Sequence, residues 1–276
     1  LGCFAVNKGG GPLFTLASKV GPKFAQVFGA FTVLIMGPFF VIPRMSAAAW
    51  DAVSKIFNIE GSSFIVLLLF TVGYYAITYW FIYKQTDIVD KVSKILVPLL
   101  LLMEVIIIAK CLLFPIGTPV AKMYPDNPLA YGFINGYQTM DLPAALMFAG
   151  IILTDIANRV KTKDKSVMFS NLVKAGIIGF LMLGLIELGE FFLGASTGSV
   201  YGDLDYAKLF ATVVLQQFGF IGAMIFNVAL VFAAMTTAIG LTAGTAEYFV
   251  DASHGKWEYK KIAIVTLAVS TIISVA

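Results

Sequence analysis

Long runs of apolar residues, nearly free of charge, recur along this 276-residue chain and limit what it can fold into. A helix rises about 1.5 Å per residue, so about 20 such residues cross the roughly 30 Å hydrocarbon core of a bilayer. The runs are continuous rather than alternating, which favours membrane-spanning helices over the strands of a barrel. The predicted spans are 24–42, 64–83, 95–113, 130–155, 175–193 and 218–249, followed by an incomplete run at 262–276.

The composition places the chain in the same class. Hydrophobic residues make up 59% and charged residues 13% of it, whereas soluble domains carry about a quarter charged residues. We therefore predict an all-α polytopic membrane protein with one transmembrane domain covering residues 1–276. The chain begins with Leu1 and stops within an apolar run, so we expect an internal fragment of a longer protein.

The distribution of Lys and Arg predicts the orientation. Fourteen of the 19 basic residues lie in one alternating set of connections, at 1–23, 84–94, 156–174 and 250–261. Because cytoplasmic loops are enriched in Lys and Arg, these connections are expected to be cytoplasmic, with the N-terminal end of the fragment among them. The formal net charge of +3 therefore reflects topology and gives no reason to expect nucleic acid binding.

Few residues suit catalysis or metal binding. Cys3 and Cys111 lack the spacing of a disulfide framework or a metal site, and the single histidine, His254, falls in a charged loop. No nucleophile and base occur at a suggestive spacing, so we do not expect an enzyme. No organic cofactor is expected either.

The stretch NGYQTMD at 135–141 places polar groups inside an apolar run. Asp141 lies ten residues into the span, about 15 Å along a helix and near the middle of the membrane. Gly132, Gly136 and Pro143 flank it and predict a broken helix. Unwound backbone at this depth lines a cavity and offers amides and carbonyls to a zwitterion and a cation. The alternative is a proline-kinked helix whose polar groups bond to a neighbouring span.

A second polar stretch, TTAIGLTAGTAEYF at 236–249, has a different pattern. Thr236, Gly240 and Glu247 share one helical face, and Gly240 and Gly244 form a small-xxx-small pair that allows another helix to approach. The hydroxyls of Thr236 and Thr237 are hard ligands suited to an alkali cation. Alternatively, these hydroxyls bond to carbonyls of their own helix.

Three stretches together resemble the branched-chain amino acid:cation symporters of bacteria: MGPFFVIPR (36–44), GFINGYQTMDLPAALMFAGII (132–152) and TTAIGLTAGTAEYF (236–249). The resemblance implies a leucine-transporter-like inverted-repeat bundle, in which substrate and sodium bind at broken helices near the midplane. It places the complete spans here as the family's third to eighth. Because the first span is absent from this stretch, the fragment alone is not expected to transport.

The resemblance also implies roles for particular residues. Substrate contacts are expected at Phe133, Asn135, Gly136, Tyr137 and Thr139, with Phe39 and Phe40 as aromatic cover. Sodium is expected at the hydroxyls of Thr236 and Thr237 and the carbonyl of Ala233, and Asp141 is expected to hold the break or sense the cation.

The expected function is uptake of Leu, Ile and Val by alternating access, coupled to a cation, in the bacterial cytoplasmic (inner) membrane. Sodium is preferred as the coupling ion; the alternatives are proton coupling, with Asp141 or Glu104 titrating, and a non-transporting membrane scaffold or subunit. The expected partners are the amino acid substrate and the lipid bilayer, and the oligomeric state is left open.

Overall fold

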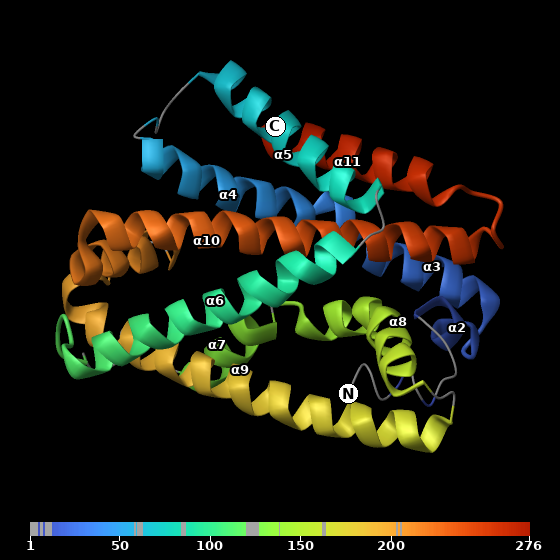
Figure 1. Ribbon diagram of the computed structural model, residues 1–276, viewed down its shortest axis with the longest axis horizontal. Coiled ribbons are helices and arrows are strands. Elements are labelled where there is room, and N and C mark those ends of the chain that lie inside the picture. Colours follow the sequence, from blue (N-terminus) through green and yellow to red (C-terminus); the bar gives the residue numbers. More distant parts are fainter. Residues whose placement is uncertain are drawn as a thin grey trace.

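Figure 1 shows the computed structural model of the chain, in which every regular element of the described residues is a helix. The described residues are 13–57, 59, 63–83, 87–119, 127–137, 139–161, 164–202, 204 and 206–276, together with Ala5 and Lys8. The helices are α2 (Leu13–Ser18), α3 (Pro22–Leu34), the π-helical segment η1 (Ile35–Phe39), α4 (Val41–Phe57), α5 (Phe64–Tyr83), α6 (Asp87–Leu113), α7 (Pro128–Tyr137), α8 (Asp141–Val160), α9 (Lys165–Tyr201), α10 (Tyr206–Ala252) and α11 (Tyr259–Val275). The all-α prediction is therefore confirmed.

The outer surface of the bundle is apolar. Four helical stretches in the described ranges are long and apolar enough to cross a bilayer: Pro22–Ser54, Phe64–Tyr83, Ser166–Tyr201 and Leu209–Ala252. Large side chains on them face outward; Phe180 and Leu185 of α9, for example, are 76% and 70% exposed. Exposure of such an apolar surface to water is unfavourable, whereas its contact with lipid is not. The chain is thus a polytopic membrane protein, as predicted.

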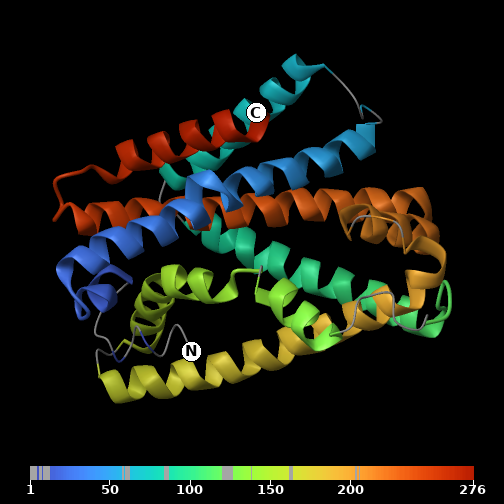
Figure 2. The same cartoon turned by 180° about the vertical axis from the view of Figure 1, so that it is seen from behind.

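Helix α10 is the central element of the bundle. It runs between α4, α5 and α11 on one side and α6, α7, α8 and α9 on the other, in both face views (Figures 1 and 2). Its most extensive partner is α4, which packs along it in the opposite direction. The two helices approach closely because small residues, such as Ala49 and Ala238, are fully buried between neighbours.

Two apolar clusters hold the helices together. The larger one joins η1 and α4 to α5, α8, α10 and α11 around Ile42, Tyr75 and Leu241. The smaller one joins α6 and α9 to the first part of α10 through Ile107 and Val213. Tyr75 also bonds the backbone, since its hydroxyl donates to the Ile42 carbonyl at 3.2 Å.

The first transmembrane stretch is interrupted at η1, which the sequence analysis did not predict. Gly37 has φ −91° and ψ −115°, outside the helical region, and Pro38 follows it. Proline removes an amide donor and clashes with the preceding turn, which accounts for a π-helical irregularity there. The span expected at 24–42 is thus two helices and a junction, and the second helix continues to Phe57.

The long helix α10 contains a sharp bend at Gly219. This residue has φ 67° and ψ −173°, a conformation open essentially to glycine alone. The segment that precedes the bend, from Tyr206 to Phe218, is too short to cross a bilayer by itself. The bend thus separates an apolar segment at one end of the bundle from the transmembrane part that follows.

Candidate functional site

The predicted interruption of the fourth apolar run is present between α7 and α8. Helix α7 ends at Tyr137 and α8 begins at Asp141, with Met140 in the left-handed region at φ 59°. The Thr139 hydroxyl lies 2.7 Å from the Gly136 carbonyl and 2.5 Å from Oδ2 of Asp141. Asp141 sits in the first turn of α8, where the helix dipole favours a carboxylate. These local bonds stabilise the break.

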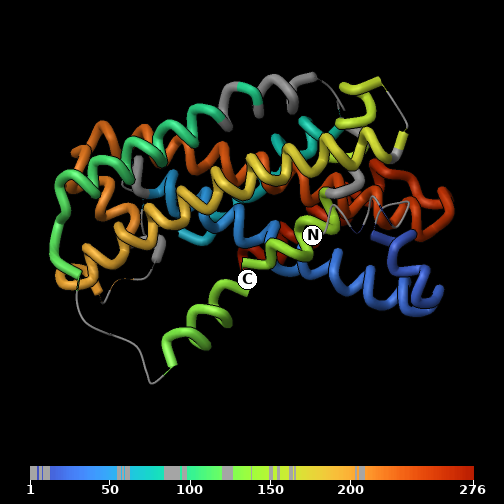
Figure 3. Tube along the Cα trace, turned by 90° about the horizontal axis from the view of Figure 1, so that it is seen from below, coloured from blue at the N-terminus to red at the C-terminus, as the bar shows by residue number. Residues whose placement is uncertain are grey.

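The predicted substrate residues that precede the break belong to α7, where Asn135 and Gly136 are helical rather than unwound. Phe133 and Tyr137 stack at 6.5 Å between ring centroids and are 72% and 67% exposed. Asn135 donates to the Tyr131 carbonyl at 2.8 Å within its own helix. No residue of α7 is buried, and α7 projects away from the bundle (Figure 3). The structure therefore does not bring these four residues to α10.

The proposed cation ligands lie on the transmembrane part of α10. The Thr236 hydroxyl donates to the Ala233 carbonyl at 2.9 Å, so two of the three predicted ligand groups are adjacent. Thr236 and Thr237 are half-buried. Thr242 and Thr245, further along, donate to carbonyls one turn earlier at 2.7 Å each. Bonding within the helix, the alternative weighed for these threonines, is thus the arrangement that the structure shows for Thr236.

Helix α8 packs on α10 next to these threonines. A Cβ on Gly240 would lie 2.9 Å from the Phe148 ring, and one on Gly244 would lie 3.4 Å from the Met147 methyl. The small-xxx-small pair therefore marks a close helix contact, as its spacing indicated. Met140, in the break, packs against the same apolar cluster as α10. The structure thus brings the break at the start of α8 and the threonine-bearing part of α10 into one packed unit.

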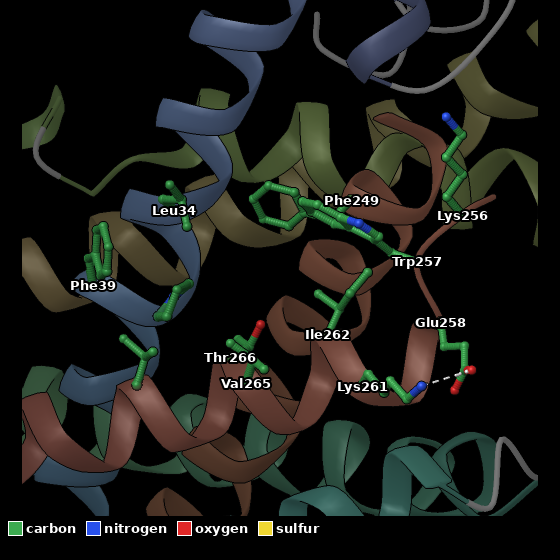
Figure 4. A pocket seen from close by; sticks show the side chains of 12 residues that line it. Leu34, Phe39, Phe249, Lys256, Trp257, Glu258, Lys261, Ile262, Val265 and Thr266 are labelled. Atoms are coloured by element: carbon green, nitrogen blue, oxygen red, sulfur yellow. Dashed lines mark hydrogen bonds and ion pairs between the residues drawn. The ribbon is translucent and has the colours of Figure 1, made fainter. Parts of the chain in front are cut away.

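Phe39 and Phe40 occupy a different part of the bundle. Phe39 lines a cavity of about 510 Å³ between η1, the end of α10 and the start of α11. Figure 4 shows it across this cavity from Phe249, with the Lys261–Glu258 ion pair of 3.0 Å at the far end. Phe40 is half exposed beside it. Neither aromatic side chain is placed at the break between α7 and α8.

Sequence reasoning missed a second cavity. It has a volume of about 540 Å³ and lies between α4, α6, α9 and α10. Ala233 forms part of its wall, together with the ionisable residues Arg44, Glu104 and Glu190. The signal available in the sequence was the occurrence of ionisable residues inside separate apolar runs.

These features define a multi-pass, all-α membrane protein with a broken helix packed on a hydroxyl-bearing one. Residues 1–276 match the family described as "Branched-chain amino acid transport protein", and the chain belongs to that family.

Three relatives show the extent of the similarity. Branched-chain amino acid permease BraB of Bacillus subtilis is 30% identical over 252 residues, which cover 90% of this chain and 56% of the relative. Branched-chain amino acid transport system 2 carrier protein of Pseudomonas aeruginosa is 30% identical, with 90% and 56% covered. Branched-chain amino acid permease BrnQ of Bacillus subtilis is 31% identical, with 95% and 60% covered. The chain spans a little over half the length of these relatives, and no solved structure matches it.

Proposed function

We propose that the protein takes part in secondary active transport of Leu, Ile and Val into the cell by alternating access, with sodium as the coupling ion. Its family and the names of its relatives support the substrate class. The observation that carries the proposal is the packing of α8, which starts at a helix break, against the threonine-bearing part of α10. Transporters commonly place substrate and coupling ion at such breaks.

The start of α8 is the proposed site for the amino acid head group. The first amides of a helix have no partner within it, and the dipole there favours an anion such as a carboxylate. The remaining substrate contacts are proposed at Phe133, Asn135, Gly136, Tyr137 and Thr139, with Phe39 and Phe40 as aromatic cover. Because α7 and these two aromatic side chains lie apart in this structure, the complete site requires a conformation in which α7 turns toward the bundle. Burial of an aliphatic side chain contributes about 1.5–3 kcal/mol. One methylene discriminates only modestly, so Leu, Ile and Val share one site.

The cation site is proposed at Thr236, Thr237 and the carbonyl of Ala233. The Thr236 hydroxyl already adjoins that carbonyl at 2.9 Å, so rotation of one side chain turns its lone pairs toward an ion. Hydroxyl and carbonyl oxygens are the ligands that hard cations prefer. Asp141 holds the break through Thr139 and senses the ion in this scheme.

The proposed location is the bacterial cytoplasmic membrane, with residues 1–23 on the cytoplasmic side. The basic residues support this orientation, because most of them lie in one alternating set of connections. The connection between α10 and α11, which carries Lys256, is cytoplasmic in the same scheme. Cavity-lining residues of α4 and α6 then lie in the outer half of the membrane.

Uptake of labelled leucine by the full-length protein in vesicles tests the proposal. A sodium gradient and a pH gradient are imposed separately, each with the other clamped. We expect uptake driven by sodium. Uptake driven by the pH gradient alone would identify the proton, and not sodium, as the coupling ion. Uptake that depends on neither gradient would refute symport.

A threonine variant tests the cation site itself. Thr236→Ala is expected to raise the sodium concentration for half-maximal uptake about tenfold and to leave the thermal stability nearly unchanged. Thr271→Ala is the matched control, since Thr271 bonds to the Leu267 carbonyl of its own helix at 2.8 Å and lies on α11. Equal sodium dependence in the two variants would remove Thr236 from the site.

A further inference from the structure

Charged side chains gather in the cavity of about 540 Å³ between α4, α6, α9 and α10. Arg44 and Asp51 come from α4, Glu104 from α6 and Glu190 from α9. The volume is in the usual range of small-ligand sites, about 300–1,000 Å³. Ionisable groups within transmembrane helices are costly and face protein or water, so they commonly mark a functional site.

The helical rise places the main charges at a similar depth. At about 1.5 Å per residue, Arg44 lies about 20 Å from the end of α4, Glu104 about 14 Å from the end of α6, and Glu190 about 17 Å from the end of α9. All three helix ends are on the outer side in the proposed orientation. Each of the three residues is also nearer the outer end than the inner end of its helical run, which is 22–57 for Arg44, 87–113 for Glu104 and 165–201 for Glu190. The cavity therefore lies toward the outer side of the bundle, at a level that a solute from outside reaches first.

The opposite charges in the cavity are not joined directly. Among the described side chains, no ion pair or hydrogen bond links Arg44 to Asp51, Glu104 or Glu190. Nor do any three described carboxylates approach closely enough to hold one metal ion. Separated positive and negative groups around one space match a ligand that carries both charges on different atoms, and match a single bound cation poorly.

Asn227 gives an independent indication of a ligand. Its side chain is 7% exposed, lines the same cavity, and has no hydrogen-bond partner among the described residues. The amide atoms themselves keep accessible surface, since the buried side-chain polar atoms without a partner among the described residues are the hydroxyls of Thr71 and Tyr74, and Asn227 lines the cavity. An unpartnered amide in the wall of a cavity is therefore a group available to a bound molecule.

We propose that this cavity is an entry site that binds an amino acid zwitterion, separate from the break between α7 and α8. The Arg44 guanidinium donates to the substrate carboxylate, and Glu104 and Glu190 accept from its ammonium group. The Asn227 amide, with donors and an acceptor, bonds either group. The inference rests on the proposed transport function and deepens it, since it says where the substrate first binds.

The remaining walls suit an aliphatic side chain. They are formed by the apolar residues Leu100, Met103, Phe210, Phe226 and Leu230. Ala233 completes the wall at the inner end, and its carbonyl is the acceptor of the Thr236 hydroxyl. A substrate that moves inward from this cavity thus meets the proposed cation site next.

Initial rates of leucine uptake by the full-length protein, measured against external leucine, test the entry site. Arg44→Gln is expected to raise KM about tenfold and to leave the maximal rate within about twofold, because the charged hydrogen bonds to the substrate carboxylate are lost. Arg44→Lys, which keeps the charge, should restore part of the affinity. Lys174→Gln removes a charge from α9 outside the cavity and should behave as wild type.

Substrate analogues identify which end of the ligand each residue binds. Leucinamide lacks the carboxylate and should compete with labelled leucine about tenfold more weakly than leucine does in the wild type. In Arg44→Gln this preference should become clearly smaller, and the part that remains reflects the carboxylate site proposed at the start of α8. Similarly, Glu104→Gln and Glu190→Gln should lose the preference for leucine over 4-methylpentanoate, which lacks the ammonium group.

The outcomes separate this inference from the proposed function. If the wild type takes up leucine and Arg44→Gln keeps its KM and its preference over leucinamide, the entry site is refuted and transport stands. If the wild type takes up no leucine, transport is refuted. Equilibrium binding of labelled leucine to the purified wild type and variants then tests the cavity, and equal affinities of the wild type and Arg44→Gln would refute the entry site. If Arg44→Gln misfolds, Ala48→Leu is the second test, because it fills part of the cavity without changing a charge. This variant should raise KM for leucine, and an unchanged KM overturns the inference.

Discussion

Replacement of Gly37 by alanine tests the contact between η1 and α10. A Cβ on Gly37 would lie 2.6 Å from Oγ1 of Thr245, about 1 Å closer than the optimal separation of non-bonded heavy atoms, which is about 3.5 Å or more. Thr245 is fully buried, and its hydroxyl donates to the Leu241 carbonyl at 2.7 Å. Because a β-branched side chain has few rotamers, it gives way only at a cost.

The magnitude follows from overpacking. Inserting a methyl group into a well-packed contact costs about 1–3 kcal/mol, so the ratio of folded to unfolded protein should fall about five- to 150-fold. Gly73→Ala in α5 is the matched control, since a Cβ there has nothing within 4 Å. In a helix interior, alanine is favoured over glycine by about 0.8–1 kcal/mol, so the control should be as stable as wild type or more stable.

The assay is a denaturant titration in mixed micelles, supported by thermal stability of the detergent-solubilised protein. The double variant Gly37→Ala with Thr245→Ala removes the atom that the new methyl group meets. It should be less destabilised than the sum of the single variants, with a coupling of about 0.5–3 kcal/mol. If Gly37→Ala matches Gly73→Ala, or the double variant shows no coupling, the close approach of η1 to α10 is not as described.

Two further substitutions test other particular contacts. Gly219→Ala should destabilise the protein by about 1–3 kcal/mol in the same titration, because its φ of 67° with ψ −173° excludes a side chain; Gly194→Ala, in open space on α9, should not. Tyr248→Phe should cost about 0.5–1.5 kcal/mol, since the buried hydroxyl donates to the Ala25 carbonyl at 3.0 Å. Tyr83→Phe, an exposed control, should leave the stability unchanged, and equal effects in either pair would contradict these contacts.

Local chemistry explains which breaks the sequence predicted. Pro143 and the glycines of the 132–136 stretch act on their own turns, so the interruption before Asp141 was visible without knowledge of any neighbour. The junction at Gly37 and Pro38 had the same kind of signal and was missed, because the apolar run continued through it. Hydropathy predicts that a segment lies in lipid, and it does not reveal whether the helix inside that segment is continuous.

The relative placement of distant segments was beyond local patterns. Gly37 meets Thr245, more than 200 residues away, and Arg44 shares a cavity with Glu190. Nothing in the spacing of either stretch identifies its partner. The same limit applies to α7: the motif predicted a break near Gly136, but whether Phe133 turns toward α10 depends on tertiary packing.

The central position of α10 links these observations. Between Ala238 and Tyr248 most residues are buried, although Glu247 is exposed, and this is typical of a helix with neighbours on several sides. Small residues make this possible. Gly240 leaves room for Phe148 of α8 on one side of α10, and Gly37 of η1 leaves room for Thr245 of α10 on another side. The threonines on these crowded faces satisfy their hydroxyls within the helix and so add no unpaired polar group. One helix thereby joins the break, the proposed cation ligands and the charged cavity, and its polar residues serve packing and the proposed site together.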